Sequence, residues 1–171
     1  EVRVIDAAGN IGTTDTQDVT INTSIPTQTV AIISFIDDVG VTQNPNSPSG
    51  TTTDDRTPTL NGTINTALAL DEKVAIYQTI SGVTTLLGYA EVTGNAWTYA
   101  VDSGLKDNSS YVFSARVENE GGNAGASSSN FNINIDLTVN VNSQSTLDTT
   151  PIITGSTGFK ILPGEYLEVT V

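Results

Sequence analysis

The sequence predicts an all-β protein, an antiparallel β-sandwich of seven strands with almost no helix. Apolar residues alternate with polar ones over short stretches, and turn-forming residues recur about every ten residues. Threonine, valine and isoleucine, which suit a pleated and half-buried surface, are enriched along the alternating stretches. The predicted strands cover residues 29–36, 57–64, 73–80, 85–92, 96–102, 110–119 and 130–139.

The predicted strands have individual sequence signals. The first, TVAIISFI at 29–36, is rich in β-branched residues, and the second opens with Pro58, which needs no ladder hydrogen bond at a strand's first residue. In this second strand, Asn61-Gly62 permits a bend or the close approach of a neighbouring group. Gly-Asn, Asp-Asn and Gly-Gly-Asn supply later turns. We expect core packing, rather than a ligand-binding platform, for Trp97, Tyr99, Val101, Tyr111 and Phe113.

One unusual string occurs twice in the chain. DDRTPTLNGT at 54–63 recurs as DTTPIITGST at 148–157, with the shared residues 93 positions apart. The matched positions are Asp55, Thr57, Pro58 and Gly62 with Asp148, Thr150, Pro151 and Gly155, and then Val74 and Ile76 with Leu167 and Val169. A second pair, VRVIDAAGNIG at 2–12 and ARVENEGGNAG at 115–125, matches 113 positions apart. The chain is therefore repetitive on the scale of a domain.

The two repeat distances, 113 and 93 residues, differ by 20, so extra residues lie between the two kinds of matched string. We expect these extra residues to be the segment 37–54. A period of about 100 residues exceeds the 20 to 50 residues of solenoid repeats, so each unit should own a hydrophobic core. We expect residues 1–23 to be the end of one unit, 24–136 a complete unit and 137–171 the beginning of a third.

The amino-acid composition argues against several classes of function. The chain has 19 acidic and 6 basic residues and a formal net charge of −13, which disfavours nucleic acid and anionic membranes and attracts divalent cations. It has no cysteine, so disulfides and thiolate metal sites are excluded, and no histidine, the commonest zinc ligand. No apolar run approaches the roughly 18 residues of a spanning helix. We expect neither nucleic-acid binding nor membrane insertion.

Catalysis has little support in the sequence. Without histidine or cysteine, a nucleophilic serine would need a lysine or aspartate helper. The three lysines, Lys73, Lys106 and Lys160, lie in strand or turn contexts typical of solvated charges. Paired carboxylates can cleave glycosides, but a supply of acidic residues does not establish their geometry. We therefore expect that the protein is not an enzyme.

Four pieces of the sequence together resemble the immunoglobulin-like tandem repeats of bacterial surface proteins. They are DDRTPTLNGT (54–63), WTYAVDSGLKDNSSYVFSARV (97–117), VIDAAGNIG (4–12) and the linker NTSIP (22–26). In this order they are similar to repeats of giant adhesins secreted by the type I route, including RTX-type and BapA-like biofilm-associated proteins. The family's Asp-Thr-Thr-Ala-Pro linker is only partly kept: NTSIP has Asn22, and IDLTV at 135–139 keeps Asp136 but lacks the proline.

The resemblance implies an immunoglobulin-like sandwich, secretion to the bacterial cell surface, and a role in cell adhesion and biofilm formation. It also implies calcium at the domain junctions. The expected partners are the neighbouring repeats of the same chain, with host or biofilm ligands contacted through other domains, and the expected state is a monomer.

Alternating strand direction gathers acidic residues at the two ends of the complete unit. The end beside the exit linker collects Asp37, Asp38, Asp54, Asp55, Asp102, Asp107 and Asp136, and the opposite end, beside Asn22, collects Asp71, Glu72, Glu118, Asn119 and Glu120. Glu165, from the 158–165 loop of the next unit, should approach the exit linker. Hard oxygen ligands without histidine or cysteine suit calcium. The alternative is that these carboxylates only cap turns and keep the surface soluble.

Two functions follow from these observations. In the first, the repeats are spacers in an adhesin stalk, stiffened by calcium at their junctions. In the second, the unit itself binds a host glycan or surface protein through exposed loops, since the segment 37–56 is long for a loop and long loops are often functional. That loop is rich in asparagine, proline, serine, glycine and threonine and has no aromatic platform, which favours the spacer.

Overall fold

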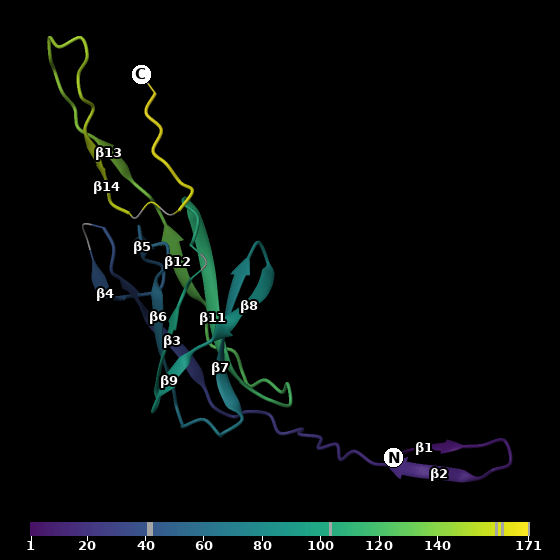
Figure 1. Cartoon of the computed structure of the whole chain (residues 1–171). Coiled ribbons are helices and arrows are strands. Elements are labelled where there is room, and N and C mark those ends of the chain that lie inside the picture. The colour runs from purple at the N-terminus through teal and green to yellow at the C-terminus, as the bar shows by residue number, and fades with distance from the viewer. Residues whose placement is uncertain (41–42, 103, 160, 162, 171) are drawn as a thin grey trace.

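The computed structural model describes residues 1–40, 43–102, 104–159, 161 and 163–170, and the described residues form strands and no helix. Two five-stranded sheets face one another in the middle of the chain (Figure 1). The first has the order β4 (Asn44–Ser47), β3 (Val30–Asp37), β6 (Thr59–Ile64), β10 (Ala96–Ala100) and β9 (Glu91–Thr93). The second has the order β5 (Thr52–Thr53), β12 (Phe131–Ile135), β11 (Ser109–Asn119), β7 (Glu72–Ile80) and β8 (Val83–Tyr89). The predicted all-β sandwich is confirmed.

The core lies between the two sheets and is built by alternation along the strands. In β11 every second residue from Tyr111 to Val117 is buried, and β12 alternates in the same way. Of the five predicted core residues, Tyr99 is only half-buried. The other four, Trp97, Val101, Tyr111 and Phe113, are at most 6% exposed. The alternation in the sequence therefore identified the buried face correctly.

The prediction departs from the structure in four places. The predicted strand 130–139 is shorter, because β12 ends at Ile135 and the linker at 136–138 forms no strand. Residues 85–92 are not one strand, because the chain leaves the second sheet after β8 and joins the first sheet as β9. The segment 37–56, of which residues 41 and 42 lie outside the described residues, contains the short strands β4 and β5. β5 pairs with β12 in parallel, so the sandwich is not entirely antiparallel. The described part of the sandwich thus has ten strands rather than seven.

The Asn61-Gly62 pair has the role that its sequence predicts. Gly62 lies under the Trp97 indole, and a Cβ at this position would overlap both the ring and the Ala31 carbonyl oxygen. The Trp97 Nε1 donates a hydrogen bond to the Thr63 carbonyl at 3.3 Å. The missing side chain therefore allows the largest core residue to lie flat against the neighbouring strand.

Two smaller hairpins lie beyond opposite ends of the sandwich (Figure 1). β1 (Val2–Ile5) pairs with β2 (Ile11–Asp15) at the N-terminal side, and β13 (Val139–Val141) pairs with β14 (Gly155–Thr157) at the C-terminal side. Both reproduce local structure of the sandwich at the distances that separate the repeated strings.

The β1–β2 turn matches the turn after β11. The Asp6 amide donates to the Asn10 carbonyl at 3.0 Å, and 113 positions later the Asn119 amide donates to the Asn123 carbonyl at 3.1 Å. In both turns the side chain at the first position accepts from the backbone amide four residues on, at 2.8 and 3.0 Å. The glycine before the second asparagine has a positive φ in each case, 87° at Gly9 and 79° at Gly122.

The β13–β14 pair repeats the register of β3 and β6. Val30, Ala31 and Ile32 face Ile64, Thr63 and Gly62, while Val139, Asn140 and Val141 face Thr157, Ser156 and Gly155. The β6 and β14 partners are 93 positions apart, as the repeated string predicts. Ile32 and Gly62 are 30 positions apart, whereas Val141 and Gly155 are 14 apart, a difference of 16 that the segment with β4 and β5 supplies.

Gly62→Ala should destabilise the sandwich, because the new methyl group would displace Trp97 or the β3 backbone. Overpacking of this kind costs about 1–3 kcal/mol. Urea unfolding followed by the fluorescence of the single tryptophan measures the change. Thr63→Ala, at the next and exposed position of β6, is the matched control and should cost less. Equal stability of the Gly62→Ala protein and the wild type would contradict the close-packing argument.

Candidate functional site

The strongest candidate site is the exit junction, where the segment after β12 meets the end of the sandwich. An open pocket of about 410 Å³ lies there, and its acidic lining residues are Asp37, Asp54 and Asp136. Asn140, Ser156 and Gly158 of the following segment line the other side. The structure therefore brings together three of the predicted acidic residues with the next segment of the chain.

Asp55 follows the pocket residue Asp54 in the chain, and only one of its two carboxylate oxygens has a hydrogen-bond partner among the described residues. The residue is 1% exposed, and its Oδ1 accepts a hydrogen bond from the Thr57 amide at 2.8 Å. Its Oδ2 is buried without a hydrogen-bond partner among the described residues, and the same holds for Oδ1 of Asp37, which is 7% exposed. Buried carboxylate oxygens without partners are costly, so a cation would stabilise both groups.

The charges in and next to the pocket also favour a bound cation. Burial raises the pKa of Asp55, and the negative charges of Asp38 and Asp37 raise it further. Burial also raises the pKa of Asp54, with a contribution from the charge of Asp37. These carboxylates therefore repel one another at neutral pH, and either a proton or a bound cation relieves the repulsion.

Asp54 lies at the boundary with the following segment. A Cβ built on Gly40 would overlap the Asp54 carboxylate, and one built on Gly158 would come within 2.7 Å of its Oδ2. A Cβ on Gly40 would also overlap the Gly158 carbonyl oxygen. A side chain at Gly40 or Gly158 would displace the Asp54 carboxylate from the junction. The absence of side chains at these two positions therefore leaves room for it.

The other predicted residues of this end have different surroundings. Asp38 is exposed, and its carbonyl accepts a hydrogen bond from the Gln43 side chain at 3.0 Å. Asp107 holds the exit linker, because its Oδ1 accepts from the Leu137 amide at 2.8 Å. Asp102 instead lines a shallow pocket beside Tyr99 and Tyr89, away from the linker. Residue 103, within the same loop, lies outside the described residues.

The entry end gathers acidic residues that already have protein partners. Asp71, Glu118, Asn119 and Glu120 line one pocket of about 240 Å³, but Lys73 lies among them. Glu118 accepts from Arg116 at 2.7 Å and from the Tyr77 hydroxyl. Glu72 does not line this pocket, because its Oε2 accepts from the Gln28 side chain at 2.5 Å and from the Ala69 amide at 2.8 Å. Protein donors therefore reach the carboxylates of Glu72 and Glu118, and the unpartnered buried oxygen at this end, Oε1 of Gln28, belongs to a neutral amide rather than to a carboxylate.

The entry linker is fixed by amide side chains. Asn123 donates to the Asn22 carbonyl at 2.9 Å, and Asn119 donates to the Ser24 carbonyl at 2.8 Å. The Asn22 side chain in turn donates to Asp71 at 3.4 Å. The turn after β11 therefore anchors the chain that enters the sandwich.

Glu165 reaches the junction, but it meets a residue that sequence reasoning missed. Both of its carboxylate oxygens lie 2.6 Å from Nη1 of Arg56. Glu165 does not line the pocket of Asp37, Asp54 and Asp136. One ion joining Glu165 to that pocket stays a prediction. The sequence did contain one indication of this contact, which is an arginine inside the acidic string DDRTP, at the end where the units should meet.

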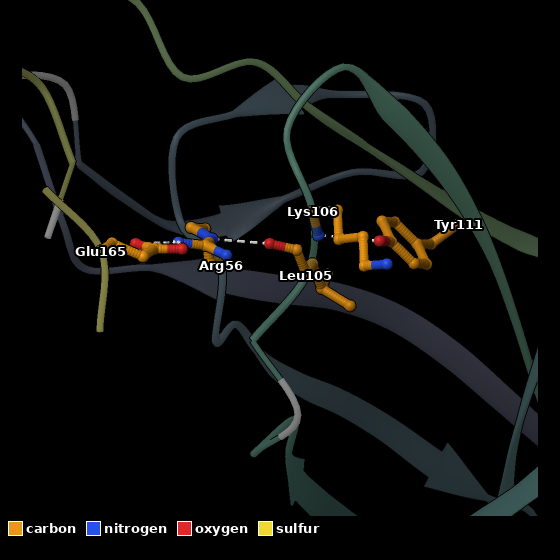
Figure 2. A network of polar contacts seen from close by, with 5 residues as sticks. All are labelled: Arg56, Leu105, Lys106, Tyr111 and Glu165. Atoms are coloured by element: carbon orange, nitrogen blue, oxygen red, sulfur yellow. Dashed lines mark hydrogen bonds and ion pairs between the residues drawn. The ribbon is translucent and has the colours of Figure 1, made fainter. Parts of the chain in front are cut away.

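Tyr111 has a second role that the sequence analysis missed, since the sequence predicted it only as a core residue. Its hydroxyl accepts a hydrogen bond from the Lys106 amide at 2.7 Å, five residues upstream (Figure 2). This bond fixes the loop between β10 and β11, in which Asn108 has a positive φ of 51°. The side chain thus packs in the core with its ring and orders the junction loop with its hydroxyl.

No protein-family model matches the chain, and neither does any curated protein. Across the described residues, no group of three or more acidic side chains comes close enough together to hold a metal ion. The donor set of the exit junction is made of oxygen atoms, which fits calcium, with carbonyls or water needed to complete its coordination. In the described part of the chain, no helix has the length and apolar character needed to cross a membrane.

The raised pKa values predict how pH affects stability in chelator. A carboxyl group whose pKa is raised by folding contributes stability that is fully present below the ordinary value of 3.8 and is lost as the pH rises through the raised pKa. At neutral pH, Asp54 and Asp55 therefore oppose folding. Asp55→Asn should raise the melting temperature at pH 7 in chelator, with a smaller gain as the pH falls towards the raised pKa. Thermal unfolding from pH 7 to 4 tests this.

Asp18→Asn, an exposed aspartate of the N-terminal segment, controls for the change in net charge. The account of Asp55 fails if the two variants melt alike at pH 7, or if Asp55→Asn is less stable than the wild type in chelator.

Proposed function

We propose that residues 24–136 are one immunoglobulin-like spacer unit in a chain of similar units, which holds a binding domain away from a bacterial cell surface. The observation that carries the proposal is the repeated register of β3–β6 in β13–β14, at the distance of the repeated string. The β1–β2 turn and the turn after β11, which lie 113 positions apart, have matching backbone hydrogen bonds, and this match supports repetition at the N-terminal side of the chain. Units repeated in this manner suit a stalk of variable length.

The strand order supports the immunoglobulin-like class. Sheets of this class place strands A, B, E and D together and strands G, F and C together. Within the two sheets, the orders β3-β6-β10-β9 and β12-β11-β7 correspond to these two sets, and β4, β5 and β8 are additional edge strands. The Tyr111 hydroxyl, bonded to the backbone upstream at the corner before β11, is a further feature of such sandwiches.

Burial of apolar positions also supports a repeated unit. Leu60, Val74 and Ile76 are fully buried in the sandwich. Their counterparts 93 positions later, Ile153, Leu167 and Val169, are 45%, 51% and 66% exposed. Apolar residues at these positions are explained if further strands cover them in the complete third unit.

We propose that calcium stiffens the exit junction through the pocket of Asp37, Asp54 and Asp136, with Asp55 next to Asp54 in the chain. The unpartnered oxygens of Asp37 and Asp55 support a cation here rather than at the entry end. Extracellular calcium modules bind with a Kd of about 10⁻⁴ to 10⁻³ M, so millimolar external calcium would occupy the site. A tenfold excess over Kd contributes about 1.4 kcal/mol, enough to bias a hinge. Secretion, adhesion, biofilm formation and the absence of catalysis belong to the same proposal.

Small-angle scattering of the 171-residue chain tests the calcium proposal. At an ionic strength high enough to screen the Arg56–Glu165 pair, the chain should be more extended and more uniform in millimolar calcium than in chelator, because one ion would tie the linker to the sandwich. Asp136→Ala should give the chelator profile at all calcium concentrations, while Asp18→Ala should respond like the wild type. Identical scattering with and without calcium would leave these carboxylates as solvated loop charges.

The alternative is a unit that itself binds a glycan or a surface protein. The groove of Tyr89, Glu91, Tyr99 and Asp102 is the observation in its favour, because aromatic and acidic side chains commonly line sugar sites. A glycan array probed with the 171-residue chain separates the two functions. The spacer predicts no saturable binding, and binding that Tyr99→Ala abolishes would favour the alternative.

A further inference from the structure

The exit junction contains a second contact, which lies apart from the acidic pocket. Arg56 of the sandwich and Glu165 of the following segment are 109 positions apart, and Nη1 lies 2.6 Å from both Oε1 and Oε2 (Figure 2). The Arg56 side chain is 11% exposed and that of Glu165 is 40% exposed. The Arg56 side of the pair is therefore desolvated, while Glu165 remains in contact with water, so solvent and salt screen part of the attraction.

The Arg56 guanidinium is held in place by the sandwich itself. Its Nε donates to the Leu105 carbonyl at 2.6 Å, while the Leu105 amide donates to the Arg56 carbonyl at 2.8 Å. The next residue, Lys106, donates its amide to the Tyr111 hydroxyl, and Tyr111 is anchored in the core. A chain of contacts thus leads from the core to the guanidinium, so less side-chain entropy is lost when Glu165 binds.

Apolar and charged residues both lie around the pair. The pocket that contains Arg56 and Glu165 is also lined by Leu137, Phe159, Ile161, Tyr166 and Leu167, and by the charged residues Lys106 and Asp107. Because the Arg56 side chain is only 11% exposed, leaving its guanidinium without Glu165 is costly. Residues 160 and 162 of this segment lie outside the described residues.

We propose that Arg56 and Glu165 form a clamp that fixes the following segment to the sandwich without a metal ion. The clamp deepens the spacer function and rests on it, because it gives the exit junction a source of stiffness that chelator does not remove. Ionic strength, rather than calcium, controls it. In the next unit Thr149 occupies the position of Arg56, 93 residues on, so the clamp is a property of this junction and not of the repeat.

Electron–electron double resonance tests the clamp. The chain has no cysteine, so Thr85→Cys on β8 and Val141→Cys on β13, both exposed, can be spin-labelled uniquely. In chelator at low salt, the labelled chain should give a narrow distance distribution. Glu165→Gln should lose this narrow component, while Glu168→Gln, which changes the same charge three residues away, should keep it. Raising the salt concentration should also broaden the distribution, because the pair is partly exposed.

Arg56→Gln completes a double-mutant cycle. The double variant should be no broader than either single variant, because each removes the same interaction. Glu165→Gln leaves the Arg56 contacts with Leu105 intact, so it separates the clamp from folding of the sandwich, which circular dichroism monitors. A narrow distribution in Glu165→Gln, or a broad one in the wild type, overturns the clamp. The calcium proposal fails separately, through the Asp136→Ala scattering result.

Discussion

The turn closed by the Asp55 carboxylate is the constraint from which both sides of the junction follow. Its amide donates to the Thr53 hydroxyl at 3.0 Å, and its Oδ1 accepts from the Thr57 amide, so the backbone from Thr53 to Thr57 has one conformation. Pro58 then leads into β6, which begins at Thr59. Because this backbone is fixed, the residues on either side of Asp55 diverge: Asp54 faces the acidic pocket and Arg56 faces Glu165. One buried side chain therefore sets the place of an anionic and a cationic contact.

The acidic pocket and the Arg56–Glu165 pair change the electrostatic energy of the folded state in opposite directions. The acidic pocket raises the energy of the folded state, since burial and neighbouring charge disfavour the ionised forms of Asp54 and Asp55. The Arg56–Glu165 pair places opposite charges together and needs no external ion. If calcium binds as proposed, the acidic pocket depends on a cation, whereas the Arg56–Glu165 pair is complete within the chain. Such a junction keeps some order when the cation is absent.

Alternation and turn chemistry were sufficient to predict most of the strands and the buried faces of β10 and β11, because those strands pair along their length. The move of the chain between sheets after Tyr89 was not predictable, since the apolar pattern continues through it. β4 and β5 were missed because asparagine, proline, serine and threonine indicate a loop. The acidic clustering followed from topology, but Arg56–Glu165 did not. The pairing of two charges across 109 positions depends on how the following segment folds back.

The repeated turn shows which part of the junction can vary. At Asp148 the amide again donates to a threonine hydroxyl two residues before, at 3.0 Å, and Oδ1 again accepts from the threonine amide two residues after, at 2.9 Å. The residue between the aspartate and that threonine is Arg56 in one turn and Thr149 in the other. Its side chain plays no part in these turn hydrogen bonds, so substitution there leaves the turn intact while changing what the turn presents to the next unit. A chain of such units can therefore vary its junctions independently of its fold.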